Sequence, residues 1–380
     1  MTDKQTVKFG DICKEVKLTT KDPIGDGYER YIGLEHLDSG SLKIKRWGMI
    51  ADDSPSFTRV FKKGHILFGK RRPYLKKAAI AEFDGICSSD IIVMEASGDK
   101  LVEGLLPHLV QSEKMWSKAS LTSAGSLSPR TKFKSLIDLE FQLPNLDDQS
   151  SLLAIFHKIE ESNDCSTYVA NNAERLEDLI LLDAVRTLPA EQIKKTKLSN
   201  ICEQITVGIV NKPADLYCEN GIPALRSQNV KRGRISLDNL VYITQEGHEA
   251  NKKSQVHPGD VVVVRTGYPG TASVIPESLE VANCVDILVI RPNTTLINPE
   301  YLSAYINSPL GKGQILEGAG GLAQQHFNVK ALKEMLIDLP SITMQETIAN
   351  SVNEVVKLAS KNEENAAKRK KMVDALKSSI

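Results

Sequence analysis

The longest uninterrupted helical pattern in the sequence lies between Pro144 and Pro189. Neither proline nor glycine occurs between these two residues, and apolar side chains recur there at the spacing of one helix face. The apolar positions are Leu152, Ile155, Phe156, Ile159, Val169, Ala173, Leu176, Leu179 and Ile180. We therefore predict one long amphipathic helix over residues 143–188. At about 1.5 Å per residue it would be roughly 60 Å long, which exceeds what a compact domain needs.

The end of the sequence repeats this pattern. The motif Leu-Pro-x-x-x-x-Gln occurs at residues 143–149 and again at residues 339–345, an offset of 196 residues. A second stretch without proline or glycine then runs from residue 341 to 380. We predict a second long helix there, paired with the first as in a coiled coil. The simpler interpretation of both apolar stripes is that they belong to ordinary core helices.

The two blocks that precede these helices also match each other. Residues 64–70 match residues 259–265 at an offset of 195, and residues 90–93 match residues 286–289 at an offset of 196. Earlier in the blocks, Phe9-Gly-Asp-Ile-Cys13 matches Leu198-Ser-Asn-Ile-Cys202 at an offset of 189. Because the offset changes within the blocks, their loops differ in length while the order of segments is kept. The chain is therefore a tandem duplication.

This duplication predicts the fold class and the domain organisation. Short apolar, strand-like pieces separated by turns rich in Gly, Asp and Ser fill both blocks. We expect an α+β fold with two similar mixed α/β domains separated by two long antiparallel helices in a pseudo-twofold arrangement. The expected segments are a first domain over residues 1–142, a central helix over 143–190, a second domain over 191–338 and a C-terminal helix over 339–380.

Composition places the chain among globular proteins. Hydrophobic residues make up 41% and charged residues 25% of the 380 residues, and no apolar run approaches the length of a membrane span. Six cysteines without a C-x-x-C pair argue against a zinc site and against a disulfide framework. With a polar N-terminus that lacks a signal-peptide pattern, the chain is expected to be cytoplasmic.

The sequence lacks the motifs of several enzyme classes. It contains no G-x-x-x-x-G-K-[ST], no G-x-G-x-x-G between a strand and a helix, and no G-x-S-x-G. Glu82, Asp84 and Asp90 offer carboxylates for a metal ion, but their setting among short apolar strands favours turn residues. We therefore predict no catalytic residue and no metal site in this chain.

The most basic stretch of the sequence is a candidate DNA-binding loop. Residues 61–80 contain no acidic residue. Within this stretch the candidate contacts are Lys70, Arg71, Arg72, Tyr74 and Lys76. Lys and Arg gain affinity for DNA by releasing its counterions, and Arg can also contact guanine with two hydrogen bonds. The alternative is a charged turn that only faces water.

The second block offers candidates at two places. Arg265 and Tyr268 leave the strand that corresponds to the one before Lys70. Earlier in the block, polar and basic side chains suited to adenine edges and phosphates are Arg226, Gln228, Asn229 and Arg232. A surface turn explains this second group equally well. Two loops of small residues, 123–130 and 318–326, could approach a DNA backbone closely or serve as connectors.

Taken together, these features resemble the specificity subunit of type I restriction-modification enzymes. The resemblance rests on the order of blocks and long helices, on the Leu-Pro-x-x-x-x-Gln helix starts, and on the segment FGKRRPYLKKAAIAEFDGICSSD. It covers essentially the whole chain. It is weaker in the second block, where Arg265-Thr-Gly-Tyr268-Pro replaces the Arg-Pro-Tyr of the first, and it carries over no individual base contact.

The resemblance implies a non-catalytic subunit that binds double-stranded DNA. Each block would read one half of a split target, and the helices would set the gap and dock two methyltransferase subunits. Those partners would bind S-adenosylmethionine, so no cofactor is expected in this chain, and restriction or translocase subunits could join them. Two alternatives stay open, namely a DNA-modifying enzyme with a degenerate site and a coiled-coil scaffold that binds only proteins.

Overall fold

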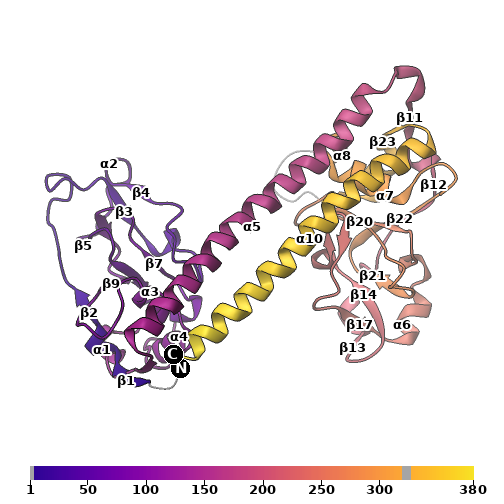
Figure 1. Cartoon of the computed structure of the whole chain (residues 1–380). Coiled ribbons are helices and arrows are strands. Elements are labelled where there is room, and N and C mark those ends of the chain that lie inside the picture. The colour runs from indigo at the N-terminus through magenta and orange to yellow at the C-terminus, as the bar shows by residue number, and fades with distance from the viewer. Residues whose placement is uncertain (1–3, 319–326) are drawn as a thin grey trace. The chain divides into compact units, whose positions relative to one another are not determined.

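A computed structural model describes residues 4–318 and 327–380 of the chain (Figure 1). Its internal contacts divide the chain into two compact units. Residues up to Asp164 together with Ala366–Ile380 form unit 1, and Cys165–Asn365 form unit 2. Each unit has its own hydrophobic core.

Unit 1 contains two four-stranded sheets and a two-stranded ribbon. The antiparallel sheet has the order β2 (Cys13–Val16), β9 (Ile91–Ala96), β6 (Ile66–Gly69), β7 (Ala78–Ile80). The mixed sheet has the order β4 (Gly48–Met49), β3 (Arg30–Ile32), β8 (Gly85–Cys87), β5 (Arg59–Phe61), with β3 parallel to β8. The ribbon pairs β1 (Gln5–Lys8) with β10 (Glu140–Leu143). The short α-helices of unit 1 are α1 (Phe9–Ile12), α2 (Ile50–Asp53), α3 (Leu106–Val110) and α4 (Glu113–Leu121).

The core of unit 1 explains why its strands read as nearly continuous apolar runs. All four residues of β6 are buried, because both faces of this strand are covered. Phe68 stacks on Trp116 of α4 with ring centroids 4.5 Å apart, while Leu67 belongs to the cluster around Phe61. A strand covered on both faces has no position for a polar residue that alternates with apolar ones. The segment that follows β6 therefore starts from a buried strand that packing holds in place.

Unit 2 repeats this topology, with one more strand at the edge of its mixed sheet and one more two-stranded ribbon among the described residues. Its antiparallel sheet has the order β12 (Cys202–Val207), β22 (Ile287–Pro292), β19 (Val261–Val264), β20 (Ala272–Val274). Its mixed sheet has the order β13 (Tyr217–Cys218), β17 (Val241–Ile243), β14 (Ile222–Leu225), β21 (Ala282–Cys284), β18 (Gln255–Val256), with β14 parallel to β21. Its ribbons pair β11 (Lys194–Lys197) with β23 (Leu336–Leu339) and β15 (Val230–Lys231) with β16 (Arg234–Ile235). Its helices are α6 (Gln245–Ala250), α7 (Pro299–Asn307), α8 (Pro309–Gly318) and α9 (Val329–Glu334).

The two long helices are α5 (Leu146–Thr187) and α10 (Ile342–Ser378), and each contributes residues to both units. Within unit 1, Arg369 of α10 donates a hydrogen bond to Asn163 of α5 at 3.0 Å. Within unit 2, Ser166 donates to the Oδ1 atom of Asn362 at 2.7 Å. The later residue of α5, Ser166, thus pairs with the earlier residue of α10, Asn362. The two helices therefore run antiparallel. The duplicated α+β fold with two long helices is thereby confirmed.

The predicted bounds and apolar stripe of the first long helix need two corrections. Leu143 is the last residue of β10, and Pro144 disfavours helical backbone in the residue before it, so the helix starts at Leu146. Four positions of the predicted stripe are also exposed rather than buried, because each unit covers only one side of the helix. They are Ile155, Val169, Leu176 and Leu179.

A buried glutamine fixes the start of each long helix. The Nε2 atom of Gln149 donates to the carbonyl oxygens of Pro144 at 2.9 Å and Lys100 at 3.0 Å, and its Oε1 atom accepts from the amide of Val102. Gln345 repeats these bonds with the carbonyls of Pro340 and Leu296 and the amide of Asn298. The Leu-Pro-x-x-x-x-Gln motif therefore ties each helix to the loop that precedes α3 or α7.

Candidate nucleic-acid interface

The predicted basic loop of unit 1 leaves the buried strand β6 and is held by backbone hydrogen bonds on both sides. The amide of Lys70 donates to the carbonyl of Asp90 at 2.9 Å, and the amide of Thr131 donates to the carbonyl of Lys70 at 3.0 Å. The amide of Arg72 donates to the carbonyl of Pro129 at 2.7 Å. The basic loop and the small-residue loop 123–130, which the sequence showed as separate candidates, therefore form one structure.

Asp90 is the anionic centre of this structure. Its carboxylate accepts a hydrogen bond from Nε of Arg130 at 2.7 Å and lies 3.5 Å from Nη1 of Arg71. The hydrogen bond from Arg130 keeps the pKa of Asp90 below its ordinary value. Arg71 also donates to the hydroxyl of Ser128 at 3.0 Å. One carboxylate thus orients two guanidinium groups and leaves this loop with net positive charge.

The outer side chains of the loop face solvent. Arg72 and Tyr74 are exposed, whereas Lys70, Arg71 and Lys76 are half-buried. Arg72 and Lys76 flank the short turn at Pro73–Leu75 and both have left-handed backbone, with φ of 52° and 50°. Buried Pro73 anchors the turn beneath them. The arrangement presents cations and an aromatic ring on a rigid base, which suits binding of a polyanion.

Burial affects the lysine at the root of the loop. Desolvation, together with the charge of Arg59, lowers the pKa of Lys70 below its ordinary value. Lys76 is paired instead with Glu113 of α4. Of the predicted contacts in unit 1, Arg72 and Tyr74 are therefore the most available to a ligand, with Arg71 beside them.

Unit 2 builds its corresponding loop with less charge. Arg265 follows β19, and its Nη1 atom donates to Asp286 at 2.9 Å, as Arg71 and Arg130 do to Asp90. Tyr268 at the tip of the loop is 85% exposed. Gly267 and Gly270 beside it have φ of 88° and 87°, a backbone that favours glycine. This loop therefore offers an aromatic ring and one fixed guanidinium group.

Arg226 and Gln228 come from the mixed sheet of unit 2, whereas this loop leaves its antiparallel sheet. They follow β14, and the amide of Val285, which follows the parallel strand β21, donates to the carbonyl of Leu225 at 2.8 Å. Arg226 donates to the carbonyl of Asn239 at 3.0 Å, and Gln228 donates to the same oxygen at 3.3 Å. The structure therefore brings the candidates after β14 close to Asp286, the partner of Arg265.

Asn229 is not available for binding, contrary to the sequence-based prediction. Its side chain is fully buried. It donates to the carbonyls of Ser236 and Asp238 and accepts a hydrogen bond from the amide of Arg226. These bonds hold the turn after β14 together, so the amide group cannot read an adenine edge.

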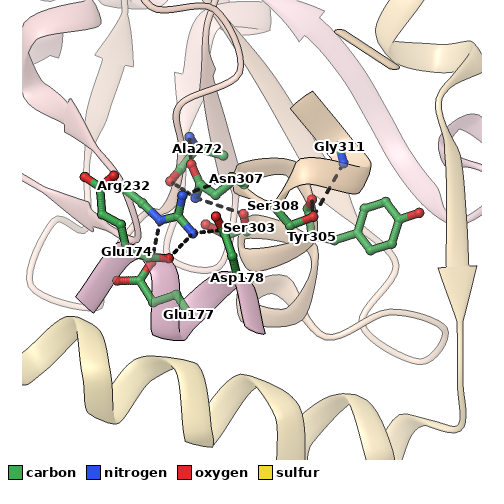
Figure 2. Close-up of polar contacts among 10 residues, drawn as sticks. All are labelled: Glu174, Glu177, Asp178, Arg232, Ala272, Ser303, Tyr305, Asn307, Ser308 and Gly311. Carbon is green, nitrogen blue, oxygen red and sulfur yellow. Dashed lines mark hydrogen bonds and ion pairs between the residues drawn. The ribbon is translucent and has the colours of Figure 1, made fainter. Parts of the chain in front are cut away.

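Arg232 forms ion pairs inside unit 2 (Figure 2), contrary to its predicted role as a DNA contact. Its side chain is 14% exposed and pairs with two acidic residues of α5, Glu177 and Asp178. Its Nη1 atom donates to the carbonyl of Asn307 at 3.1 Å. The next residue, Gly233, faces Val356 of α10 so closely that a Cβ atom would lie 3.0 Å from it.

The remaining sequence candidates have structural partners or lie outside the described residues. Asp84 accepts a hydrogen bond from the amide of Lys63 at 2.8 Å and pairs with Lys62. Within residues 4–318 and 327–380, no group of His, Cys, Asp and Glu is arranged to hold a metal ion. Over the same residues, no helix is long and apolar enough to span a bilayer. The predicted loop 318–326 falls almost wholly in the stretch that the structure does not describe.

Comparisons of sequence show what the chain is similar to. Residues 190–369 match the family described as "Type I restriction modification DNA specificity domain". The specificity subunit of the EcoBI type I restriction enzyme from Escherichia coli is 27% identical over 177 residues, which cover 46% of this chain and 37% of that subunit. The match thus spans little more than a third of this relative. The MjaVIII specificity subunit from Methanocaldococcus jannaschii is 20% identical, with 98% of this chain and 91% of that subunit covered.

Solved structures share the fold. A chain from a study of complex assembly and conformational transition of the type I R-M system matches with a TM-score of 0.59 and 20% identity, covering 100% of this chain and 97% of that one. The S subunit of a type I restriction-modification system from M. genitalium matches with a TM-score of 0.57 and 12% identity, covering 99% and 96%. These comparisons confirm the resemblance found in the sequence: residues 190–369 match the type I restriction modification DNA specificity domain, and the whole chain is similar to type I specificity subunits.

Proposed function

We propose that this chain is the sequence-recognition subunit of a type I restriction-modification complex and is not itself catalytic. The observation that carries the proposal is the repeated placement of a candidate binding loop. In both units the loop leaves the third strand of the antiparallel sheet and is fixed by an Arg–Asp pair, Arg71 with Asp90 and Arg265 with Asp286. Two similar binding surfaces in one chain suit a target with two half-sites.

The loops have the chemistry for both parts of DNA recognition. Arg72 and the exposed face of Arg71 suit phosphates or guanine, and the rings of Tyr74 and Tyr268 suit stacking or apolar contact with bases. The rigid base of each loop reduces the entropy lost on binding. In unit 2, Arg226 and Gln228 extend the proposed surface, while Asn229 and Arg232 are excluded from it.

The long helices are proposed to set the unread gap in the target and to dock the partners. Large apolar side chains stand exposed on α5 in unit 2, among them Tyr168, Leu176 and Leu179. Exposed apolar side chains on a helix suit a partner surface. The proposed partners are two methyltransferase subunits, which bind S-adenosylmethionine, and restriction subunits that join them.

The experiment that tests DNA binding compares the wild-type chain with the Arg71→Ala/Arg72→Ala variant, each assembled with its methyltransferase partner. The slope of log K against log salt is negative, and each lost phosphate contact reduces its magnitude by about 0.9. We expect the variant to lose at least about tenfold in duplex affinity and up to about two units of slope. Lys14→Ala, which removes an exposed lysine paired with Glu95 on another strand, is the control and should change neither quantity.

Two results would replace the proposal with an alternative. Wild-type affinity in the double variant would favour a scaffold that binds only proteins. Methyl transfer or cleavage by the isolated chain, supplied with S-adenosylmethionine or a divalent metal, would identify a DNA-modifying enzyme with a degenerate site.

A further inference from the structure

Arg30 of unit 1 rests against two aromatic rings. Its Cζ atom lies 4.9 Å from the ring centroid of Trp47 and 4.9 Å from that of Phe83. The two rings meet edge to face with centroids 5.5 Å apart, so they form a notch that holds the guanidinium group. A guanidinium over aromatic faces is attracted by their electron density. Arg30 is therefore held in one orientation without using any of its N–H donors.

The notch is anchored to the core of the unit. Phe83 packs on the fully buried Phe61 with ring centroids 5.8 Å apart. Arg30 is the first residue of β3, whose next residue on the same face, Ile32, belongs to the same buried cluster as Phe61. Trp47, by contrast, is exposed. One side of the notch is thus rigid, and the other opens to solvent.

Arg30 differs from other arginines of unit 1 in its polar contacts. Arg46 donates to the carbonyl of Glu35 and to Asp38, and Arg59 pairs with Glu15. Among the residues that the structure describes, the side chain of Arg30 has neither a hydrogen bond nor an ion pair, and it is half-buried. An oriented guanidinium with five unused donors matches the geometry of an oxyanion with two oxygens.

We propose that Arg30 binds a phosphate group of the DNA backbone, and this proposal rests on the proposed function of the chain. A phosphate fits better than a base for a geometric reason. Base edges lie at the floor of a groove about 8.5 Å deep, which admits an α-helix or a two-stranded β-ribbon but is too narrow for a four-stranded sheet such as the one that contains Arg30. Arg30 is on a strand, with its side chain held back against two rings, and it can meet the phosphates at the rim of the groove.

The contact is specific to unit 1. The strand registers place Pro223 where β3 has Arg30, and Leu240 precedes β17 as Trp47 precedes β4. Two residues before β21, Glu280 stands where Phe83 precedes β8. Unit 2 therefore has neither the cation nor the rings, and unit 1 should contribute one more phosphate contact.

The test measures binding of the full chain, assembled with its methyltransferase partner, to a mixed-sequence duplex between about 50 and 200 mM salt. Arg30→Ala should reduce the magnitude of the slope of log K against log salt by about 0.9 and weaken binding severalfold. Arg30→Gln, which keeps the length of the side chain and its packing, should do the same. Arg30→Lys should keep most of the slope, and Lys14→Ala should match the wild type.

Three outcomes would overturn the proposal in different ways. A wild-type slope and affinity in both Arg30→Ala and Arg30→Gln would show that the stack is structural. A wild-type slope with altered discrimination at one base pair would make Arg30 a base reader instead. If the wild-type complex itself showed no salt-dependent binding to duplex DNA, the proposed function would fail, and this contact would fail with it.

Discussion

The two units agree in their buried polar contacts and differ at their exposed ends. Gln149 and Gln345 make the same three hydrogen bonds at an offset of 196 residues. Asp90 and Asp286 each pair with arginine beside the central strand. At the exposed tips, by contrast, Arg72 and Tyr74 of unit 1 give way to an uncharged turn around Tyr268 in unit 2.

This difference separates two kinds of constraint on a duplicated chain. A buried polar group that loses its partner costs about 1–3 kcal/mol, so such contacts change little without loss of stability. Exposed loop residues carry no such cost and can diverge between copies. Under the proposed function, the divergent tips are the parts that would give each half-site its own sequence.

The two units also differ in the ion pairs that join each of them to α5. Between β14 and β17 of unit 2, Arg232 meets Glu177, which is 6% exposed, and Asp178. In unit 1 the corresponding segment, between β3 and β4, contacts α5 through an ion pair between Lys43 and Asp164. Both of these side chains are exposed. Burial raises the pKa of Glu177, against the opposing hydrogen bond from Arg232. The two ion pairs therefore differ mainly in desolvation.

The largest effect is expected from Arg232→Ala. Removing one partner of a buried ion pair leaves an uncompensated charge and typically costs about 3–5 kcal/mol. Thermal or urea unfolding should show that loss, with no change in the salt dependence of DNA binding. Lys43→Ala should cost less than about 1 kcal/mol because its pair is exposed. A wild-type unfolding curve for Arg232→Ala, together with weaker DNA binding, would restore the role that the sequence suggested.

The next effect comes from the helix-anchoring glutamines. Gln149→Ala and Gln345→Ala each leave two carbonyls and one amide without their partner, and we expect a loss of about 2–3 kcal/mol in either case. Hydrogen exchange measured by mass spectrometry should localise each loss to the unit that carries the change. The exposed Gln142→Ala is the control. Unequal losses would show that the same hydrogen bonds contribute differently to the stability of the two units.

The smallest effect is a pH dependence confined to unit 1. Burial, with the charges of Lys377 and His157, lowers the pKa of His108 to about 3, and its ring stacks on Phe156 at 4.3 Å with Glu160 4.0 Å away. The unfolded chain takes up this proton near pH 6.5 and the folded chain does not, so stability falls as the pH drops below 7. The loss should be about 1 kcal/mol between pH 7 and 5.5.

Hydrogen exchange at the two pH values can separate the units. Unit 2 has Ala304 at the offset of 196 residues from His108, so its corresponding helix should keep its protection. His108→Asn should flatten the dependence in unit 1. An equal loss of protection in both units, or an unchanged dependence in the variant, would contradict the assignment to His108.

The repeat, the long helices and the basic loop were predictable because they depend on local signals. Proline and glycine are unfavourable inside long helices, so a stretch of about forty residues without them is visible in the sequence, as is a run of charges of one sign. The roles of Asn229, Arg232 and Arg30 were not predictable, because each depends on a partner distant in the chain. Polar residues near a turn look alike in sequence, whether the fold buries them, pairs them with a helix or leaves them stacked on rings.

The proposed division of recognition between the units is tested most directly by mapping methylated sites in genomic DNA. The host would carry this chain with its methyltransferase partner, in wild-type form or with Arg72→Ala in unit 1 or Tyr268→Ala in unit 2. We predict a split motif for the wild type, with Arg72→Ala relaxing one half and Tyr268→Ala relaxing the other. A contiguous motif, or a change in both halves from either substitution, would contradict the account.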